Sequence, residues 1–242
     1  MEKNNMLKKC IFAVIICVLL MIVFSIMIKY DVEGEKQLPF SISKILVVST
    51  VDGNIVEDTE NIWNVGVTQV NDIYMYINKT SDEETTISSI SLNNFIVNKE
   101  PKKGKLKLLR PTGELSNLYS SSEQDYLSEG ITYLGGIIDD MKSLEIGNNG
   151  GILGFRMSVE DLGSYISNDD TEIIYDGRLL SNLGITEEEL YFDISFDIII
   201  ETSDKVKYKG TTSLQMPIKG FIEKGSENLE ITDFTNLVFK RI

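Results

Sequence analysis

The chain has 242 residues and a formal charge of −14 at neutral pH, and it contains no histidine. The absence of imidazole excludes every serine or cysteine triad built on histidine and removes the commonest general base and metal ligand. The acidic balance disfavours nucleic acid as a partner, because phosphate binding needs a net basic surface. Both cysteines, Cys10 and Cys17, lie in one apolar segment, so the rest of the chain has no thiol for a disulfide or a zinc site.

The apolar segment at residues 10–28 contains nineteen residues and no charge. As a helix it would extend roughly 28 Å at 1.5 Å per residue, which is enough to cross a bilayer core. We therefore predict a cytoplasmic tail at 1–9 and a transmembrane helix at 10–28. A cleavable signal peptide is the alternative, but its apolar region is usually shorter and ends in small residues. Lysines near the two ends are equal in number, and the adjacent Lys8 and Lys9 favour an extracytoplasmic domain at the cell membrane.

A polar, acidic stretch follows at residues 29–38 and is typical of a stalk that separates a domain from the membrane. The remainder, residues 39–242, is long enough for one large β-rich domain or two small ones. We place a possible sub-boundary near residue 111. A Ser-, Gly- and Asn-rich stretch at 116–151 predicts a short irregular insert, with a helical turn at 137–144.

Two neighbouring segments, 190–201 and 205–216, alternate apolar and polar residues. This period of two predicts half-buried strands that form a hairpin. Residues directly opposite in an antiparallel pair share a face, so we expect Glu201 or Asp197 opposite lysines and the isoleucines opposite Val206 or Tyr208. That pairing requires an odd number of residues in the loop, most simply three.

Other short runs rich in β-branched and aromatic residues predict further strands. They lie at 43–51, 64–70, 73–78, 87–97, 104–109, 152–159, 173–175 and 234–241. Turn signals fall at 52–54, 82–84 and 102–104. Many short strands separated by turns predict an all-β fold, specifically an antiparallel β-sandwich-like extracytoplasmic domain.

Basic residues gather in one part of this acidic domain. The candidate contact residues for an anionic ligand are Lys102, Lys103, Lys105, Lys107 and Arg110. Alternate lysines on a strand project from one face, which suggests a docking strip for an anionic envelope polymer or for lipid headgroups. The alternative is that lysines on an exposed edge strand block edge-to-edge aggregation.

No motif for a cofactor, a metal or catalysis emerges. The glycine-rich stretch 147–154 lacks the dinucleotide spacing and precedes a predicted strand instead of opening a helix. Acidic residues at 168–172 do not fit the EF-hand template, although they leave open a calcium site completed by remote partners. We therefore predict no catalytic residue, no cofactor and no metal.

Four runs carry a resemblance to known proteins: NDIYMYINK from Asn71, PKKGKLKLLRP from Pro101, GNNGGILGFRMSVEDLGSYISNDDTEIIYDG from Gly147, and the terminal LEITDFTNLVFKRI. They resemble a group of uncharacterised, single-pass, membrane-anchored exported proteins of Gram-positive bacteria. The resemblance implies location at the cell envelope and brings no activity, cofactor or catalytic residue.

The sequence thus predicts a non-enzymatic, membrane-anchored cell-envelope protein that binds a partner protein or an anionic envelope polymer. One alternative is a histidine-free, carboxylate-dependent hydrolase or sugar-active enzyme of the cell surface. Another is a scaffold subunit of an envelope assembly.

Overall fold

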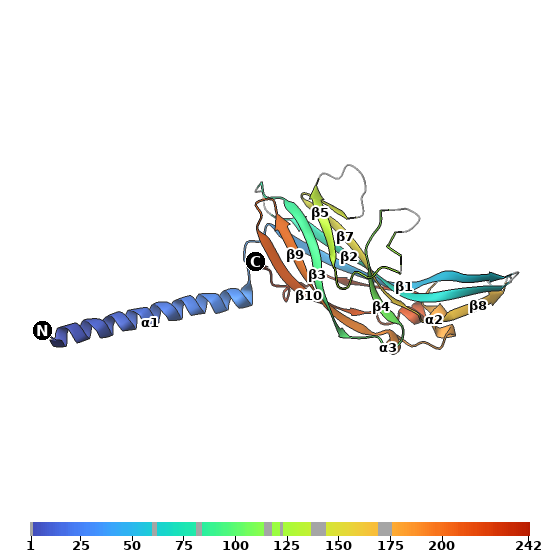
Figure 1. Cartoon of the computed structure of the whole chain (residues 1–242), viewed down its shortest axis with the longest axis horizontal. Coiled ribbons are helices and arrows are strands. Elements are labelled where there is room, and N and C mark those ends of the chain that lie inside the picture. The colour runs from blue at the N-terminus through green and yellow to red at the C-terminus, as the bar shows by residue number, and fades with distance from the viewer. Residues whose placement is uncertain are drawn as a thin grey trace.

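A long N-terminal helix and a β-rich body make up the protein (Figure 1). The computed structural model describes residues 2–59, 62–80, 84–113, 118–121, 123–136, 144–168 and 176–242. Helix α1 spans Glu2–Glu33, and the apolar part from Ile11 onward is exposed along its whole length. The predicted apolar helix is confirmed, and it continues into the residues predicted as a stalk. A helix of this length and composition can be a membrane anchor or a signal sequence.

In the described part of the chain, twelve strands form one sheet. They are β1 (Phe40–Thr59), β2 (Ile62–Lys79), β3 (Ile87–Lys99), β4 (Lys105–Leu109), β5 (Ile131–Gly136), β6 (Glu145–Gly147), β7 (Gly150–Glu160), β8 (Ser164–Asn168), β9 (Phe192–Thr202), β10 (Lys207–Met216), β11 (Glu227–Ile231) and β12 (Lys240–Arg241). Their order is β11-β1-β2-β7-β6-β5-β3-β9-β10-β12, while β4 pairs with β7 and β8 with β2.

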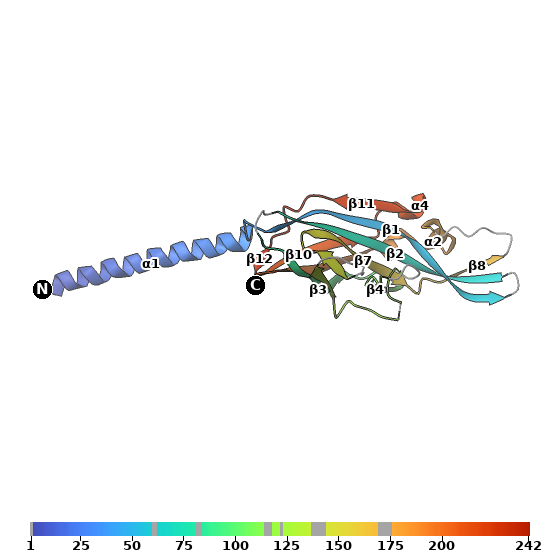
Figure 2. The ribbon, with the colours of Figure 1, turned by 90° about the horizontal axis from the view of Figure 1, so that it is seen from above.

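The sheet curls into a half-barrel (Figure 2). The expected β-rich fold is confirmed, but the sheet is mixed and is not strictly the antiparallel, sandwich-like arrangement that we expected. The mixed character arises because β5 and β6 pair in parallel. Bulges bend strands and increase their twist, and the pairing register shifts within β1 at Ile42/Lys44 and within β3 at Asn93/Ile96. One long sheet therefore wraps around its own apolar face.

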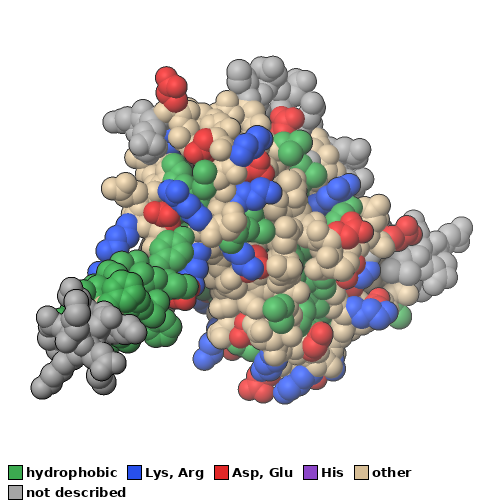
Figure 3. Space-filling view, turned by 60° about the vertical axis from the view of Figure 1, so that its left-hand side comes forward, with side chains coloured by type: hydrophobic (Ala, Val, Ile, Leu, Met, Phe, Trp, Pro, Cys, Tyr) green, Lys and Arg blue, Asp and Glu red, His purple; other side chains and the backbone are tan. Residues whose placement is uncertain are grey.

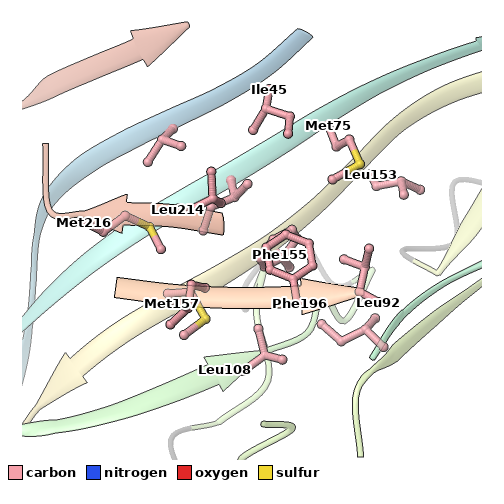
Figure 4. Close-up of a cluster of buried hydrophobic side chains, with 14 of the residues drawn as sticks. Ile45, Met75, Leu92, Leu108, Leu153, Phe155, Met157, Phe196, Leu214 and Met216 are labelled. Carbon is pink, nitrogen blue, oxygen red and sulfur yellow. The ribbon is translucent and has the colours of Figure 1, made fainter. Parts of the chain in front are cut away.

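The core fills the concave side of this sheet (Figure 4). Phe155 on β7 and Phe196 on β9 are completely buried, and their ring centroids lie 5.8 Å apart. Between these two strands the sheet passes through β6, β5 and β3. The contact therefore spans the interior of the curl and is not a neighbour contact along the sheet.

Short helices complete the described part of the body: α2 (Arg178–Asn182), α3 (Glu187–Leu190) and α4 (Phe221–Lys224). At the start of α3, Thr186 and Glu189 form a capping box, in which side chains satisfy backbone N–H groups that the first turn leaves unpaired.

The predicted hairpin is confirmed as β9 and β10. Glu201 pairs with Lys207 and Ile200 with Tyr208. Charged residues of the two strands therefore share one face of the hairpin and apolar residues share the other, as predicted. Three loop residues separate Thr202 from Val206, and the Thr202 N–H donates to the Val206 carbonyl at 3.0 Å. Asp197 and Lys209 form an ion pair at 2.7 Å.

Several expected boundaries differ from the structure. The turn expected at 52–54 lies inside β1, and the strands expected at 64–70 and 73–78 are one strand, β2, because the two strands pair along almost their whole length. At the C-terminus, only Lys240 and Arg241 of the expected strand are extended and paired.

Some expected elements fall outside the described residues. They are the strand at 173–175, most of the turn at 82–84, and the helical turn at 137–144 apart from its last residue. Near the expected sub-boundary, strands on both sides of residue 111 belong to the same sheet.

Candidate functional site

The predicted basic contact residues lie on and around β4. Lys105 and Lys107 lie on this strand, Lys102 and Lys103 precede it, and Arg110 follows it. Among the described strands β4 pairs only with β7, so it is an edge strand. Lys105 and Lys107 therefore lie on an edge strand, as the alternative interpretation of the sequence expects.

Each of the three alternate lysines faces a carboxylate. Lys103 pairs with Glu189 at 3.0 Å, Lys105 with Asp161 at 2.7 Å, and Lys107 with Glu160 at 3.2 Å. These partners come from α3 and from the end of β7 with the residue that follows it. The positive charge of the segment is thus compensated locally, which fits edge protection better than a free anion-binding strip.

Arg110 does not join this row. Its guanidinium carbon lies 4.7 Å from the centre of the Tyr126 ring, an arrangement in which the cation is attracted by the ring face. Lys and Arg side chains are interspersed with acidic ones on the face turned toward α1 (Figure 3). An exclusively basic patch is not seen on that face.

Glu189 is held as a carboxylate by the groups around it. The Thr186 backbone N–H donates to its side chain at 2.9 Å, and the Lys103 ammonium lies 3.0 Å away. These contacts lower the pKa of Glu189 from 4.5 to about 2, with the Thr186 backbone hydrogen bond as the largest cause and the Lys103 hydrogen bond next. The basic segment is thereby tied to the capping box of α3.

A Glu189→Gln variant is expected to lose part of the acid sensitivity of the protein. A carboxyl group whose pKa is lowered by folding stabilises the native state above its unfolded pKa of about 4.5. That contribution disappears as the pH falls through the folded value of about 2. The difference in urea midpoint between wild type and variant should therefore shrink from pH 5 to pH 2. Glu188→Gln, which changes an exposed charge on the same helix, is the matched control; an equal pH profile for both variants would contradict the assignment.

A second polar cluster lies on the convex face of β1, β2 and β7. Asp72 on β2 is directly opposite Arg156 on β7, and the guanidinium donates two hydrogen bonds to that carboxylate, at 2.7 and 3.0 Å. Asp52 accepts a third, longer bond at 3.4 Å. The Arg156 guanidinium also lies 4.3 Å from the centre of the Tyr119 ring. Sequence reasoning missed this cluster, because it depends on the register of β2 against β7.

The chemistry available at Arg156 is limited by these contacts. Burial, together with the charge of Asp72, raises the pKa of Tyr119, so its hydroxyl remains protonated. Asp72 accepts two charge-assisted hydrogen bonds from Arg156, which fix the position of its carboxylate. A carboxylate fixed in this way holds β2 and β7 together.

Asp197 on β9 is the most deeply buried carboxylate among those whose burial is described, with an exposure of 6 %. Burial alone would raise its pKa, but donors from Lys209, Thr211 and Asn94 hold the pKa below its usual value. The distances are 2.7, 2.6 and 2.6 Å. Asn94 adopts a φ of +53° at the bulge of β3, so this carboxylate fixes a bend in the sheet.

The junction between α1 and the body is held by the C-terminal strand. The Arg241 N–H donates to the Tyr30 hydroxyl at 2.9 Å, and the Glu35 N–H donates to the Phe239 carbonyl at 2.8 Å. Ion pairs join Lys240 to Asp31 and Arg241 to Glu35, at 3.0 and 2.9 Å. The residues predicted as a stalk are therefore packed against the body over part of their length.

At the end of the body away from α1, three strands extend as an arm (Figures 1 and 2). We define the arm as residues 51–59 of β1, residues 62–68 of β2, and β8. In the arm β2 is central, with β1 on one side and β8 on the other.

Among the described residues, no three histidine, cysteine, aspartate or glutamate side chains are placed to hold a metal ion. The possible calcium ligands at 169–172 lie outside them. Comparisons with known proteins find no matching family model, no matching curated protein and no matching solved structure.

Proposed function

We propose that this protein is a membrane-anchored, non-enzymatic binding module that presents its β domain outside the cytoplasm and recruits a partner protein. The observation that carries the proposal is the junction between α1 and the C-terminal strand. Contacts from Tyr30, Asp31 and Glu35 to residues 239–241 join the helix to the body at two backbone positions and two ion pairs. Such contacts hold the domain at a defined orientation to the membrane.

A fixed orientation is useful to a protein that presents a surface. It holds one end of the body away from the bilayer, where a partner protein can reach it. The arm lies at that end (Figure 1). A partner protein is favoured over an anionic polymer because Lys103, Lys105 and Lys107 already face carboxylates.

Labelling of intact cells tests the side and the recruitment. A Ser203→Cys variant places a thiol in the exposed β9–β10 loop, and a membrane-impermeant maleimide should label it without lysis, while the wild-type chain stays unlabelled. An impermeant cross-linker applied to the same cells should join the wild-type chain to one protein in a fixed ratio. Labelling that requires lysis, or no cross-linked protein under any condition, would overturn the proposal.

Loosening the junction is expected to expose it to trypsin. Cleavage of a native chain requires local opening, and the Tyr30→Ala/Arg241→Ala variant lacks the hydroxyl acceptor and one ion pair. Trypsin should cut this variant at Lys36 about tenfold faster than the wild type, which corresponds to about 1.4 kcal/mol of local stability. Lys224→Ala, at the far end of the body, is the control and should leave the rate unchanged. Equal rates for all three proteins would show that a free stalk joins helix and domain.

A further inference from the structure

The arm leaves one long strand edge open. Strand β11 pairs with β1 only up to Ser49, opposite Glu227. From Thr50 to Thr59, β1 has β2 on one side and no strand among the described residues on the other. An unpaired edge presents a row of backbone N–H and C=O groups that can pair with another extended chain.

Two hydrogen bonds show which backbone groups face this edge. Gly53 pairs with Val67 across the ladder, but the Gly53 N–H donates to the Asp52 carboxylate at 2.9 Å and the Val67 N–H donates to the Gly163 carbonyl at 2.9 Å. Gly53 and Val67 are therefore a pair without hydrogen bonds between them. In an antiparallel ladder such pairs alternate with hydrogen-bonded pairs, so the next pair of this kind is Ile55 with Val65. The backbone N–H and C=O groups of Gly53 and Ile55 thus point to the open edge.

The composition of this edge differs from that of the edge strand β4. On β4, Lys105 and Lys107 provide the charged side chains that commonly protect an edge. Residues 50–59 of β1 contain no lysine, no arginine and no proline, and their charged residues are Asp52, Glu57 and Asp58. The register of β1 shifts between Ile55 and Glu57, and a bulge of this kind interrupts the edge locally. The acidic side chains of the edge would attract a strand of opposite charge.

The charge of this edge has one sign. Residues 50–59 of β1 contain three acidic residues and no basic one. A second copy of this chain is disfavoured as an occupant, because two such acidic strands would repel each other when paired directly. An extended, lysine- or arginine-rich segment would meet opposite charge.

We infer that residues 53–59 of β1 form a docking edge for an extended basic segment of a partner protein, which adds to the arm as a fourth strand. Main-chain hydrogen bonds supply the affinity in this mode of recognition, and side chains supply the specificity. The inference rests on the proposed function and names the part of the body that would contact the partner.

The single tryptophan of the chain provides the readout. Trp63 lies on β2 directly opposite Asp58, so its emission reports on the arm. The full chain in detergent is titrated with a ten-residue peptide of alternating lysine and threonine, which should give a saturable change. The same peptide with glutamate in place of lysine should give none. A peptide of alternating lysine and proline keeps the charge but lacks half of the N–H donors, and it should bind at least tenfold more weakly.

Two proline variants separate strand addition from simple charge attraction. Gly53→Pro removes an N–H that faces the open edge and leaves the ladder with β2 intact. An incoming peptide carbonyl would replace the Asp52 carboxylate as the acceptor of this N–H, so the variant should weaken peptide binding at least tenfold. Asn228→Pro is a closely matched control. The Asn228 N–H also donates to the side chain of the preceding residue, Glu227, at 3.1 Å, but Asn228 lies on the edge strand β11, outside the arm. It should bind the peptide within twofold of the wild type. Far-UV circular dichroism verifies that each variant is folded.

A charge variant keeps the test decisive if Gly53→Pro does not fold. Glu57→Lys/Asp58→Lys reverses two charges without changing the backbone, and it should also weaken binding at least tenfold. Unchanged binding by Gly53→Pro, equal binding of the proline-containing peptide, or self-association of the wild type that Gly53→Pro abolishes would each overturn the inference. If Gly53→Pro loses the peptide but keeps its cross-linked partner in cells, the docking edge is wrong and the proposed function stands.

Discussion

Replacing Phe196 with alanine is expected to lower the free energy of unfolding by about 3–5 kcal/mol. The Phe196 ring is completely buried, stacks on Phe95 with 5.0 Å between centroids, and meets Phe155 edge-on at 5.8 Å. Its removal takes away both the transfer free energy of the ring and the contacts across the interior of the curl. Because Phe155 and Phe196 lie on non-adjacent strands, no backbone ladder compensates for this loss directly.

Urea denaturation of the full chain in detergent, followed by circular dichroism, measures the cost. Leu134→Ala is the control, because Leu134 is 62 % exposed on β5, and its cost should stay below about 0.5 kcal/mol. A cost below about 1 kcal/mol for Phe196→Ala would mean that the interior of the half-barrel is not closed by these three rings.

Local patterns in the sequence were sufficient for the hairpin of β9 and β10. The alternation of apolar and polar residues, the matching of faces between the two strands and the loop length all depend on residues close to one another in the chain. The pairing of Glu201 with Lys207 follows from them. The turn signal at 52–54 was also local, yet β1 continues through it, because the long pairing with β2 extends on both sides. Tertiary pairing here overrides turn propensity.

The curl and the convex polar cluster could not be predicted in this way. Closing the sheet requires pairings between distant segments, such as β3 with β9 and β4 with β7, and a single sequence gives no register for them. The contact between Asp72 and Arg156 joins residues 84 positions apart. For the same reason, the lysines of the basic segment were recognised, whereas Glu160, Asp161 and Glu189 were not recognised as their partners.

A buried polar network on the concave face joins the sheet to the segment that follows β10. Ser49, Gln69 and Asn71 are completely buried. Asn71 accepts hydrogen bonds from the Ser49 hydroxyl at 2.7 Å and the Gln69 amide at 2.9 Å, and it donates to the Gln69 carbonyl oxygen at 3.0 Å. Ser49 in turn accepts from the Ile218 N–H at 2.9 Å. The network therefore connects β1 and β2 to the chain that leads into α4.

An Asn71→Leu variant is expected to lose about 2–4 kcal/mol, because it leaves the Gln69 carbonyl oxygen and the Ser49 hydroxyl buried with fewer partners, at about 1–3 kcal/mol for each unsatisfied group. Replacing both amides, in Gln69→Leu/Asn71→Leu, should cost less than the sum of the two single variants, since paired polar groups replaced together leave fewer orphans. Asn228→Leu, on the exposed part of β11, is the control and should change stability little.

The double-variant cycle discriminates between two roles for these side chains. A coupling free energy of about 1 kcal/mol or more between the two substitutions identifies a cooperative network that fixes the segment after β10 on the sheet. Strict additivity would mean that each amide is satisfied independently. The position of Ile218 would then depend on apolar packing instead.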